Sequence, residues 1–161
     1  MQIEMTIKGV LVDPVTNDPI IILRDKDGQR VLPICVGVHE ANAIGLQIEN
    51  VAPERPMTHD LLRDVIQALD GTVDKVVVCD LRKNTFFALI HLTVRGEAVS
   101  IDSRPSDAIA LALRARAPIF VEDHVLESAP TIESTPERTS TQRLQKWLES
   151  LDADDLGKYK M

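Results

Sequence analysis

The sequence predicts an α+β fold, in which a mixed, largely antiparallel sheet packs with about three helices as a single domain followed by a short C-terminal helical tail. Three observations predict it: segments in which apolar and polar residues alternate, segments with apolar residues at helical spacing, and the order strands, two helices, strands, helix. The chain has 161 residues, of which 44% are hydrophobic, so one compact domain with an appendage is expected. Because only 3% of the residues are aromatic, the core must be built from aliphatic side chains.

The first third of the chain predicts strands. Residues 3–7 alternate between apolar and polar side chains, which is the period-two pattern of a half-buried strand. The segments 20–23 and 30–36 flank residues 25–28 (Asp-Lys-Asp-Gly), a sequence typical of a hairpin turn. We therefore expect these two segments to pair across that turn.

Two helices should follow. Helical spacing over residues 39–50 predicts the first, and Thr58 is a favourable N-cap for the second, which should end just before Gly71. The stripe of the second helix that we expect to be buried consists of Leu61, Leu62, Val65, Ile66 and Leu69.

The rest of the domain should alternate again between strands and a helix. Strands are predicted over 72–81, 85–95, 98–102 and 119–121. A third helix should begin at Pro105, a residue suited to the first helical turn.

The predicted domain covers residues 1–128. The polar composition of residues 129–140 predicts a linker, and we expect residues 141–161 to form a helical tail. A helix over about 141–151 is too short to be stable alone, so it should dock on its own domain or on a partner.

Charge and composition narrow the choice of partners. The net charge is -7, which counts against a protein that holds nucleic acid mainly through a cationic surface, although a local basic cleft or a bound divalent cation stays compatible with it. No apolar run approaches the roughly 20 residues of a membrane span, and no secretory signal is visible. Cys35 and Cys79 are not spaced as a redox or zinc motif. We expect a cytoplasmic protein without membrane contact.

Three predicted helix starts concentrate polar residues. Glu40 opens the first helix, His59 and Asp60 open the second, and the segment 102–107 (Asp-Ser-Arg-Pro-Ser-Asp) opens the third. Each has an ordinary explanation, because acidic residues and hydroxyls at a helix start satisfy free N–H groups and complement the helix dipole. Taken alone, each is better explained as a cap than as an active site.

If the helix starts converge, they supply the groups for metal-assisted attack on a phosphodiester. Carboxylates would hold Mg²⁺ or Mn²⁺, the metal would activate water and polarise the phosphoryl oxygen, and an arginine would stabilise developing charge. The carboxylates are those of Glu40, Asp60, Asp102 and Asp107, the imidazole is that of His59, and the guanidinium groups are those of Arg55 and Arg104.

The same segments resemble the bifunctional nuclease domain family, formerly a bacterial domain of unknown function. The resemblance runs from about Met1 to Leu126 and is most specific in the last motif. It rests on Leu32–Gly37 with Glu40-Ala41, Arg55–Leu62, Asn84–Ala88 and Asp102–Ala112. Two residues depart from the usual pattern: Cys35 replaces an aromatic residue, and Phe87 replaces a tyrosine, so this chain lacks that hydroxyl.

The resemblance implies a self-associating α+β domain with nuclease activity on RNA and DNA. The motif positions that it carries over to this chain are Glu40, Arg55, His59, Asp60, Asp102, Arg104, Ser106 and Asp107. From the chemistry of these side chains we expect catalytic roles for His59, Asp60, Asp102 and Asp107, substrate binding by Arg55, Arg104 and Ser106, and metal binding by Glu40, Asp60, Asp102 and Asp107. The implied partners are nucleic acid as substrate and further copies of the chain.

A second hypothesis is a binding or assembly module without catalysis. The third motif would then be a structural helix start, with Arg104 tied to a carboxylate such as Asp60 or Asp102. The net charge of -7 and the scarcity of aromatic residues modestly favour the hypothesis of a non-catalytic module. Whether the chain is an enzyme is therefore open at this point.

Overall fold

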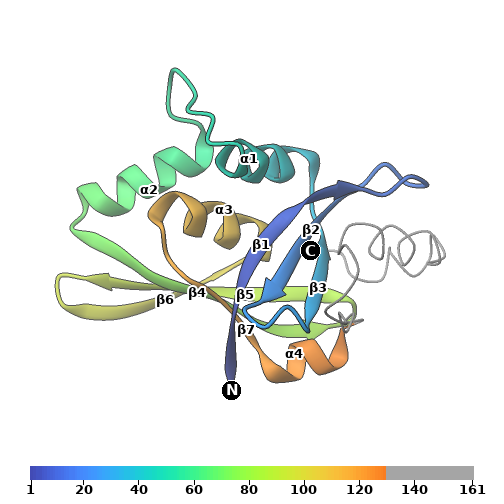
Figure 1. The fold of residues 1–161 in the computed structure, drawn as a ribbon. Helices are drawn as coiled ribbons and strands as arrows, with labels where there is room; N and C mark the ends of the chain where they lie inside the picture. The colour runs from blue at the N-terminus through green and yellow to red at the C-terminus, as the bar shows by residue number, and fades with distance from the viewer. Residues whose placement is uncertain (130–161) are drawn as a thin grey trace.

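The computed structural model describes residues 1–129, which form one mixed sheet with helices on both faces (Figure 1). The strands are β1 (Gln2–Val12), β2 (Pro19–Asp25), β3 (Val31–Cys35), β4 (Gly71–Arg82), β5 (Thr85–Val94), β6 (Glu97–Ser103) and β7 (Ile119–Glu122). The helices are α1 (Val38–Ile48), α2 (Thr58–Ala68), α3 (Pro105–Ala115) and α4 (Asp123–Ser128). The predicted α+β class is confirmed.

The sheet has the order β3-β2-β1-β7-β4-β5-β6. Every neighbouring pair is antiparallel except β4 and β7, which are parallel, so the prediction of a mixed, largely antiparallel sheet is confirmed. β7 lies between β1 and β4 and thus joins the amino-terminal three-stranded part to the β4–β5–β6 part. The edges of the sheet are β3 and β6.

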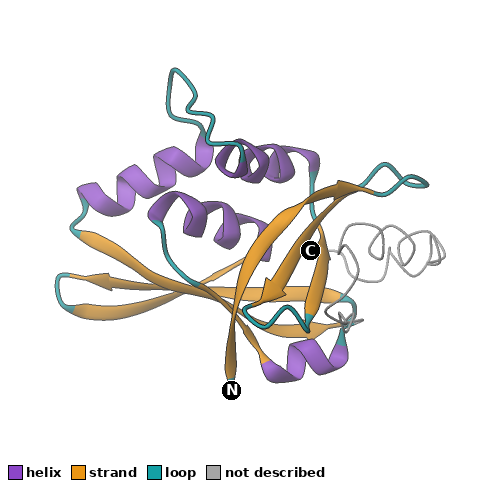
Figure 2. Cartoon of the chain, viewed as in Figure 1, coloured by secondary structure: helices purple, strands orange, loops and turns teal. Residues whose placement is uncertain are grey.

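Three helices, α1, α2 and α3, lie on one face of the sheet, and α4 lies on the other (Figure 2). α3 is the central helix, because it contacts α1, α2, β4 and β5. Its alanines allow this close packing, and eight of its eleven residues are buried. The core is aliphatic, as expected, and is formed mainly by inward-facing Val, Ile and Leu of the strands against α3.

The structure corrects three details. Met57, not Thr58, is the N-cap of α2, and Thr58 is the first helical residue. The short helix α4 was not predicted, because six residues are too few to show a helical period. The stripe on α2 that should be buried is largely exposed, with Leu61 57% and Leu69 59% accessible to solvent, because no described element covers it.

The predicted tail lies outside the described residues, as does all of the predicted linker beyond Ala129. Among the described residues, none of the helices is long and apolar enough to cross a membrane. The cytoplasmic location stays a prediction.

Candidate functional site

The first turns of α1, α2 and α3 meet above the sheet and bring together four of the predicted site residues. These are Glu40 from α1, His59 from α2, and Arg104 and Asp107 from the start of α3, and we call them the helix-start cluster. Each of the three helices carries an acidic residue at its third position, Glu40, Asp60 or Asp107. The convergence that the sequence left open is thus present for two of the four predicted carboxylates.

Arg104 lies at the centre of the cluster. Its Nη2 donates to Oε1 of Glu40 at 2.8 Å and lies 2.9 Å from Oδ2 of Asp107, which also accepts from Nε at 3.0 Å. The arginine therefore ties α1 to α3. Its side chain is 54% exposed, whereas that of Glu40 is 17% exposed, so the guanidinium is the most accessible charge of this pair.

His59 makes the second contact to Asp107. Its Nε2 lies 2.9 Å from Oδ1 of Asp107, so the two carboxylate oxygens of that residue face different partners. The His59 side chain is only 11% exposed, and this bond fixes the ring in one orientation. An imidazole held by a carboxylate is an arrangement used for proton transfer in many enzymes.

The surroundings of Glu40 and Arg104, the pair that joins α1 to α3, favour the ionised forms of both side chains. The pKa of Glu40 lies below its usual value, because its own backbone N–H and Arg104 stabilise the carboxylate against the opposing effect of burial. The pKa of Arg104 is raised by its hydrogen bonds to Glu40 and Asp107. Gly37, the N-cap of α1, makes room for this arrangement, because a Cβ there would collide with Oε2 of Glu40.

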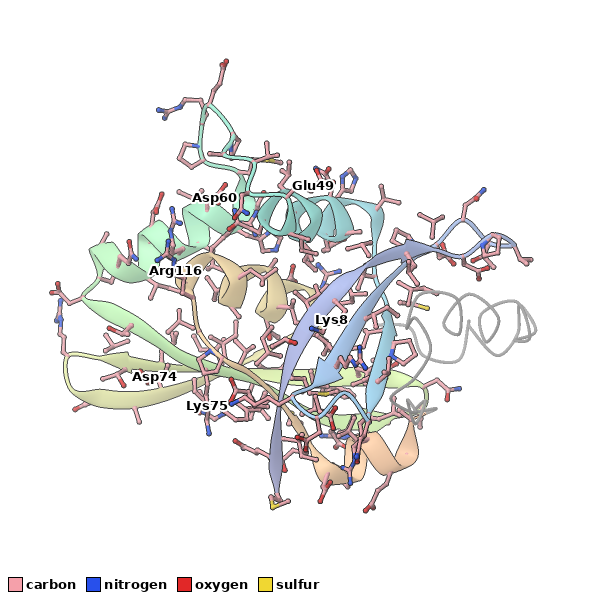
Figure 3. The ribbon with its side chains drawn as sticks, in the orientation of Figure 1. Lys8, Glu49, Asp60, Asp74, Lys75 and Arg116 are labelled. Atoms are coloured by element: carbon pink, nitrogen blue, oxygen red, sulfur yellow. The ribbon has the colours of Figure 1, made fainter. Side chains whose placement is uncertain are left out.

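Asp60 belongs to a separate, buried ion pair. Figure 3 labels it at the start of α2, next to the loop that joins α1 to α2. Its Oδ1 accepts from Nε of Arg114 at 2.7 Å, with side-chain exposures of 9% for Asp60 and 1% for Arg114. Oδ2 accepts from the backbone N–H of Met57 at 2.9 Å and so caps α2.

Arg114 was missed by the sequence analysis. It also donates to the backbone carbonyls of Ala43 and Ala110, so this one side chain connects α1, α2 and α3. An arginine in an apolar, alanine-rich helix indicates a buried ion pair, because a buried guanidinium requires a buried partner. Asp60 is that partner.

Asp102 points away from the cluster. Asp102 pairs with Leu89 across β6 and β5, whereas its neighbours Ile101 and Ser103 pair with Ile90 and Ala88, which are buried under the helices. Since side chains alternate along a strand, Asp102 points to the opposite face of the sheet. On that face, burial raises the pKa of the Cys79 thiol, and the negative charge of Asp102 raises it further.

Arg55 and Ser106 differ in exposure. Arg55 is exposed in the loop between α1 and α2, and none of the contacts within residues 1–129 connects it to the cluster. Ser106, in the first turn of α3, is 0% exposed, so its side chain faces the interior rather than solvent.

The donor set does not fit a divalent cation as it is arranged here. Across residues 1–129, no three side chains of His, Cys, Asp or Glu group together in a way that could hold a metal ion. Glu40 and Asp107 face each other across Arg104, and Asp60 is paired with Arg114. A cation at Glu40 and Asp107 would need Arg104 to leave both carboxylates.

The fold and the cluster define an α+β domain whose charged residues converge at three helix starts, and the comparisons with known proteins place it in a family. The model of the bifunctional nuclease domain matches residues 21–134. The chain belongs to the bifunctional nuclease domain family, as its motifs predict.

The similar proteins are of two kinds. An uncharacterized protein of Mycobacterium tuberculosis is 37% identical over 161 residues, covering 94% of this chain and 96% of that protein. Bifunctional nuclease 2 of Oryza sativa subsp. japonica is 33% identical over 64% of this chain, and bifunctional nuclease 1 of Arabidopsis thaliana is 32% identical over 68% of it. These matches span only 33% and 35% of the plant proteins.

Proposed function

We propose that this protein is a nuclease that hydrolyses phosphodiester bonds of RNA, DNA or both at the helix-start cluster. The observation that carries the proposal is Asp107, whose two oxygens hold His59 on one side and Arg104 on the other. The plant relatives, which bear the name bifunctional nuclease, support this class of substrate.

In the proposed reaction, His59 moves the proton and Arg104 meets the phosphate. Nε2 of His59 is hydrogen-bonded to Asp107, whereas Nδ1 makes no hydrogen bond within the described residues. Nδ1 is therefore the atom that would exchange a proton with the attacking or leaving oxygen. The exposed Arg104 guanidinium would leave Glu40 for a phosphoryl oxygen and stabilise its developing charge. The positive ends of three helix dipoles would favour the incoming anion.

Cleavage of labelled single-stranded RNA and DNA by the purified full chain tests this function. We expect cleavage by the wild type and at least a hundredfold loss in Asp107→Ala, because a positioned acid or base contributes roughly 10²–10⁴-fold. Asp102→Ala is the matched control, since that aspartate lies on the opposite face of the sheet. Equal activity of Asp107→Ala and the wild type would refute the assignment of the site.

The expectation of Mg²⁺ or Mn²⁺ can be tested without any measurement of activity. If Arg104 is the cation that balances Glu40 and Asp107, titration calorimetry with Mn²⁺ should show weak or no saturable binding to the wild type. Arg104→Gln should bind at least tenfold more tightly, about 1.4 kcal/mol, because both carboxylates then lack a counter-charge.

Arg63→Gln serves as the control for the Mn²⁺ titration, because it frees only one carboxylate, that of Asp64. Tight Mn²⁺ binding to the wild type would restore the metal-assisted mechanism. Cleavage that stops when a chelator is added would do the same.

The assembly-module hypothesis is the second candidate, and one observation favours it. All three acidic residues at the helix starts have partners, as structural caps and ion pairs do. Arg104 is indeed tied to carboxylates, although to Glu40 and Asp107 rather than to Asp60 or Asp102. Saturable binding of nucleic acid without turnover would support this candidate.

A further inference from the structure

Helix α2 contacts the rest of the domain mainly through its first turn. His59 and Asp60 are its only buried residues, and among its apolar residues only Ile66 packs, partly buried, against the core. The side chains of Leu61 and Val65 are exposed. Within residues 1–129, the orientation of α2 therefore depends mainly on the polar contacts at its start.

Two consecutive residues of α2 contact two separate points on α3. His59 contacts Asp107 in the first turn of α3, and Asp60 contacts Arg114 in its last turn. Seven positions separate Asp107 from Arg114, which is close to two full turns, so both lie on the same side of α3, about 10 Å apart along its axis. Two contacts at this separation fix the rotation of α2 about its own axis, which the contact between His59 and Asp107 alone would not fix.

The guanidinium of Arg114 is itself held in one place. The side chain is 1% exposed, and its Nη1 and Nη2 donate to the backbone carbonyls of Ala110 at 2.9 Å and Ala43 at 3.0 Å. Ala43 lies three residues after Glu40 in α1, so the two residues are on the same side of that helix. Because the guanidinium is planar and its donors have a fixed geometry, these contacts fix α1 and α2 relative to α3.

We infer that Asp60 and Arg114 are positioning residues for the nuclease reaction, because their ion pair holds the His59 ring against Asp107. The inference rests on the proposed function. The Asp60 carboxylate is occupied by Arg114 and by the Met57 N–H, so it acts through His59 rather than on the substrate or on a cation. An ionised carboxylate can only accept a hydrogen bond, so the contact with Asp107 places the proton of His59 on Nε2 and leaves Nδ1 as the basic nitrogen.

The double variant Asp60→Asn with Arg114→Leu tests the positioning role, because it removes the ion pair without leaving a buried charge unbalanced. The amide that replaces the carboxylate can still accept from the Met57 N–H, so the cap of α2 is retained. We expect kcat on single-stranded RNA or DNA to fall about 100-fold, since a displacement of about 1 Å can cost that much. KM should change little, because Arg104 keeps its contacts in the helix-start cluster.

Val125→Ala is the control for a loss of stability. Val125 is 0% exposed in α4, on the opposite face of the sheet, so this variant loses packing without losing a contact between α2 and α3. It should keep the wild-type kcat wherever circular dichroism shows that it is folded. An equal fall of kcat in Val125→Ala would overturn the positioning role, because instability alone would then account for it.

Arg114→Lys is the second test and replaces the double variant if that variant does not fold. An ammonium group keeps the charge beside Asp60, but it lacks the planar fork that reaches the carbonyls of Ala43 and Ala110 together. We expect kcat to fall about tenfold or more. A wild-type kcat in folded Arg114→Lys would overturn the role of the guanidinium.

The Nε2 proton of His59 reports the positioning without any measurement of activity. In ¹⁵N-edited NMR the wild type should show it as a slowly exchanging signal, assigned by its absence in His59→Gln, because the ring is buried and bonded to Asp107. The signal should be lost to exchange in the double variant and kept in Val125→Ala. A folded double variant that keeps either this signal or the wild-type kcat would overturn the inference, while cleavage by the wild type upholds the proposed function. If the wild type cleaves neither RNA nor DNA, the proposed function fails, and the signal alone decides whether Asp60 and Arg114 position His59.

Discussion

Replacing Arg114 with leucine is expected to destabilise the domain by about 3–5 kcal/mol, the usual cost of removing one partner of a buried ion pair. The substitution leaves the Asp60 carboxylate buried without its counter-charge, and it removes the donors to the carbonyls of Ala43 and Ala110. Because a domain of this kind is stable by only about 5–15 kcal/mol, the loss should be obvious in urea unfolding followed by circular dichroism.

The effect should depend on pH in a defined direction. In the wild type, burial opposes ionisation of Asp60, but the Met57 N–H and Arg114 outweigh it and lower the pKa of this carboxyl. The pair therefore adds stability above the unfolded pKa of about 3.9, and that stability is lost as pH falls through the lower folded pKa. In Arg114→Leu we expect the pKa of Asp60 to lie above its wild-type value, because burial is then opposed by the Met57 N–H alone, so protonation of Asp60 should relieve part of the destabilisation as the pH falls.

The difference between wild type and Arg114→Leu should thus shrink as the pH falls from 7 toward 4. A double variant, Asp60→Asn with Arg114→Leu, serves as the control, because it removes the uncompensated charge and should be more stable than Arg114→Leu alone. If Arg114→Leu unfolds at the wild-type urea concentration, the buried pair does not hold the three helices together.

The elements were largely predictable from the sequence, because strand and helix periods are local properties. Local patterns do not show which element packs against the apolar face of a given helix or strand. The stripe on α2 has the spacing of a buried face, and its exposure in a single chain follows from the lack of a described covering element. The short helix α4 was missed for the related reason that six residues carry too little pattern.

The candidate site was predictable in part for the same reasons. The third positions of the helices drew attention to Glu40, Asp60 and Asp107, but only the packing of α3 decides that Asp107 meets His59 while Asp60 meets Arg114. The separation of Asp102 was readable in principle, because the alternation of Val99 and Ile101 places Asp102 on the other face of its strand.

Replacing His59 with glutamine should reduce cleavage by roughly 10²–10⁴-fold if this imidazole transfers the proton. Asp107→Asn should cause a similar loss, because the amide cannot hold both the ring and Arg104 as the carboxylate does. Residues that act as a unit are not additive, so the double variant should be little worse than either single one. His124→Gln is the control, since that histidine is exposed in α4 on the other face of the sheet.

The pH profile separates a catalytic role for His59 from a structural one. If the imidazole transfers the proton, the pH–rate profile of the wild type should have a limb that depends on the protonation of His59. The residual activity of His59→Gln should lack this limb. A merely structural histidine would lower the rate at every pH and leave the shape of the profile unchanged. If His59→Gln keeps both the rate and the profile, the contacts of Asp107 serve to fasten α2 and Arg104 to α3, and the assembly-module hypothesis becomes the better account of the helix-start cluster.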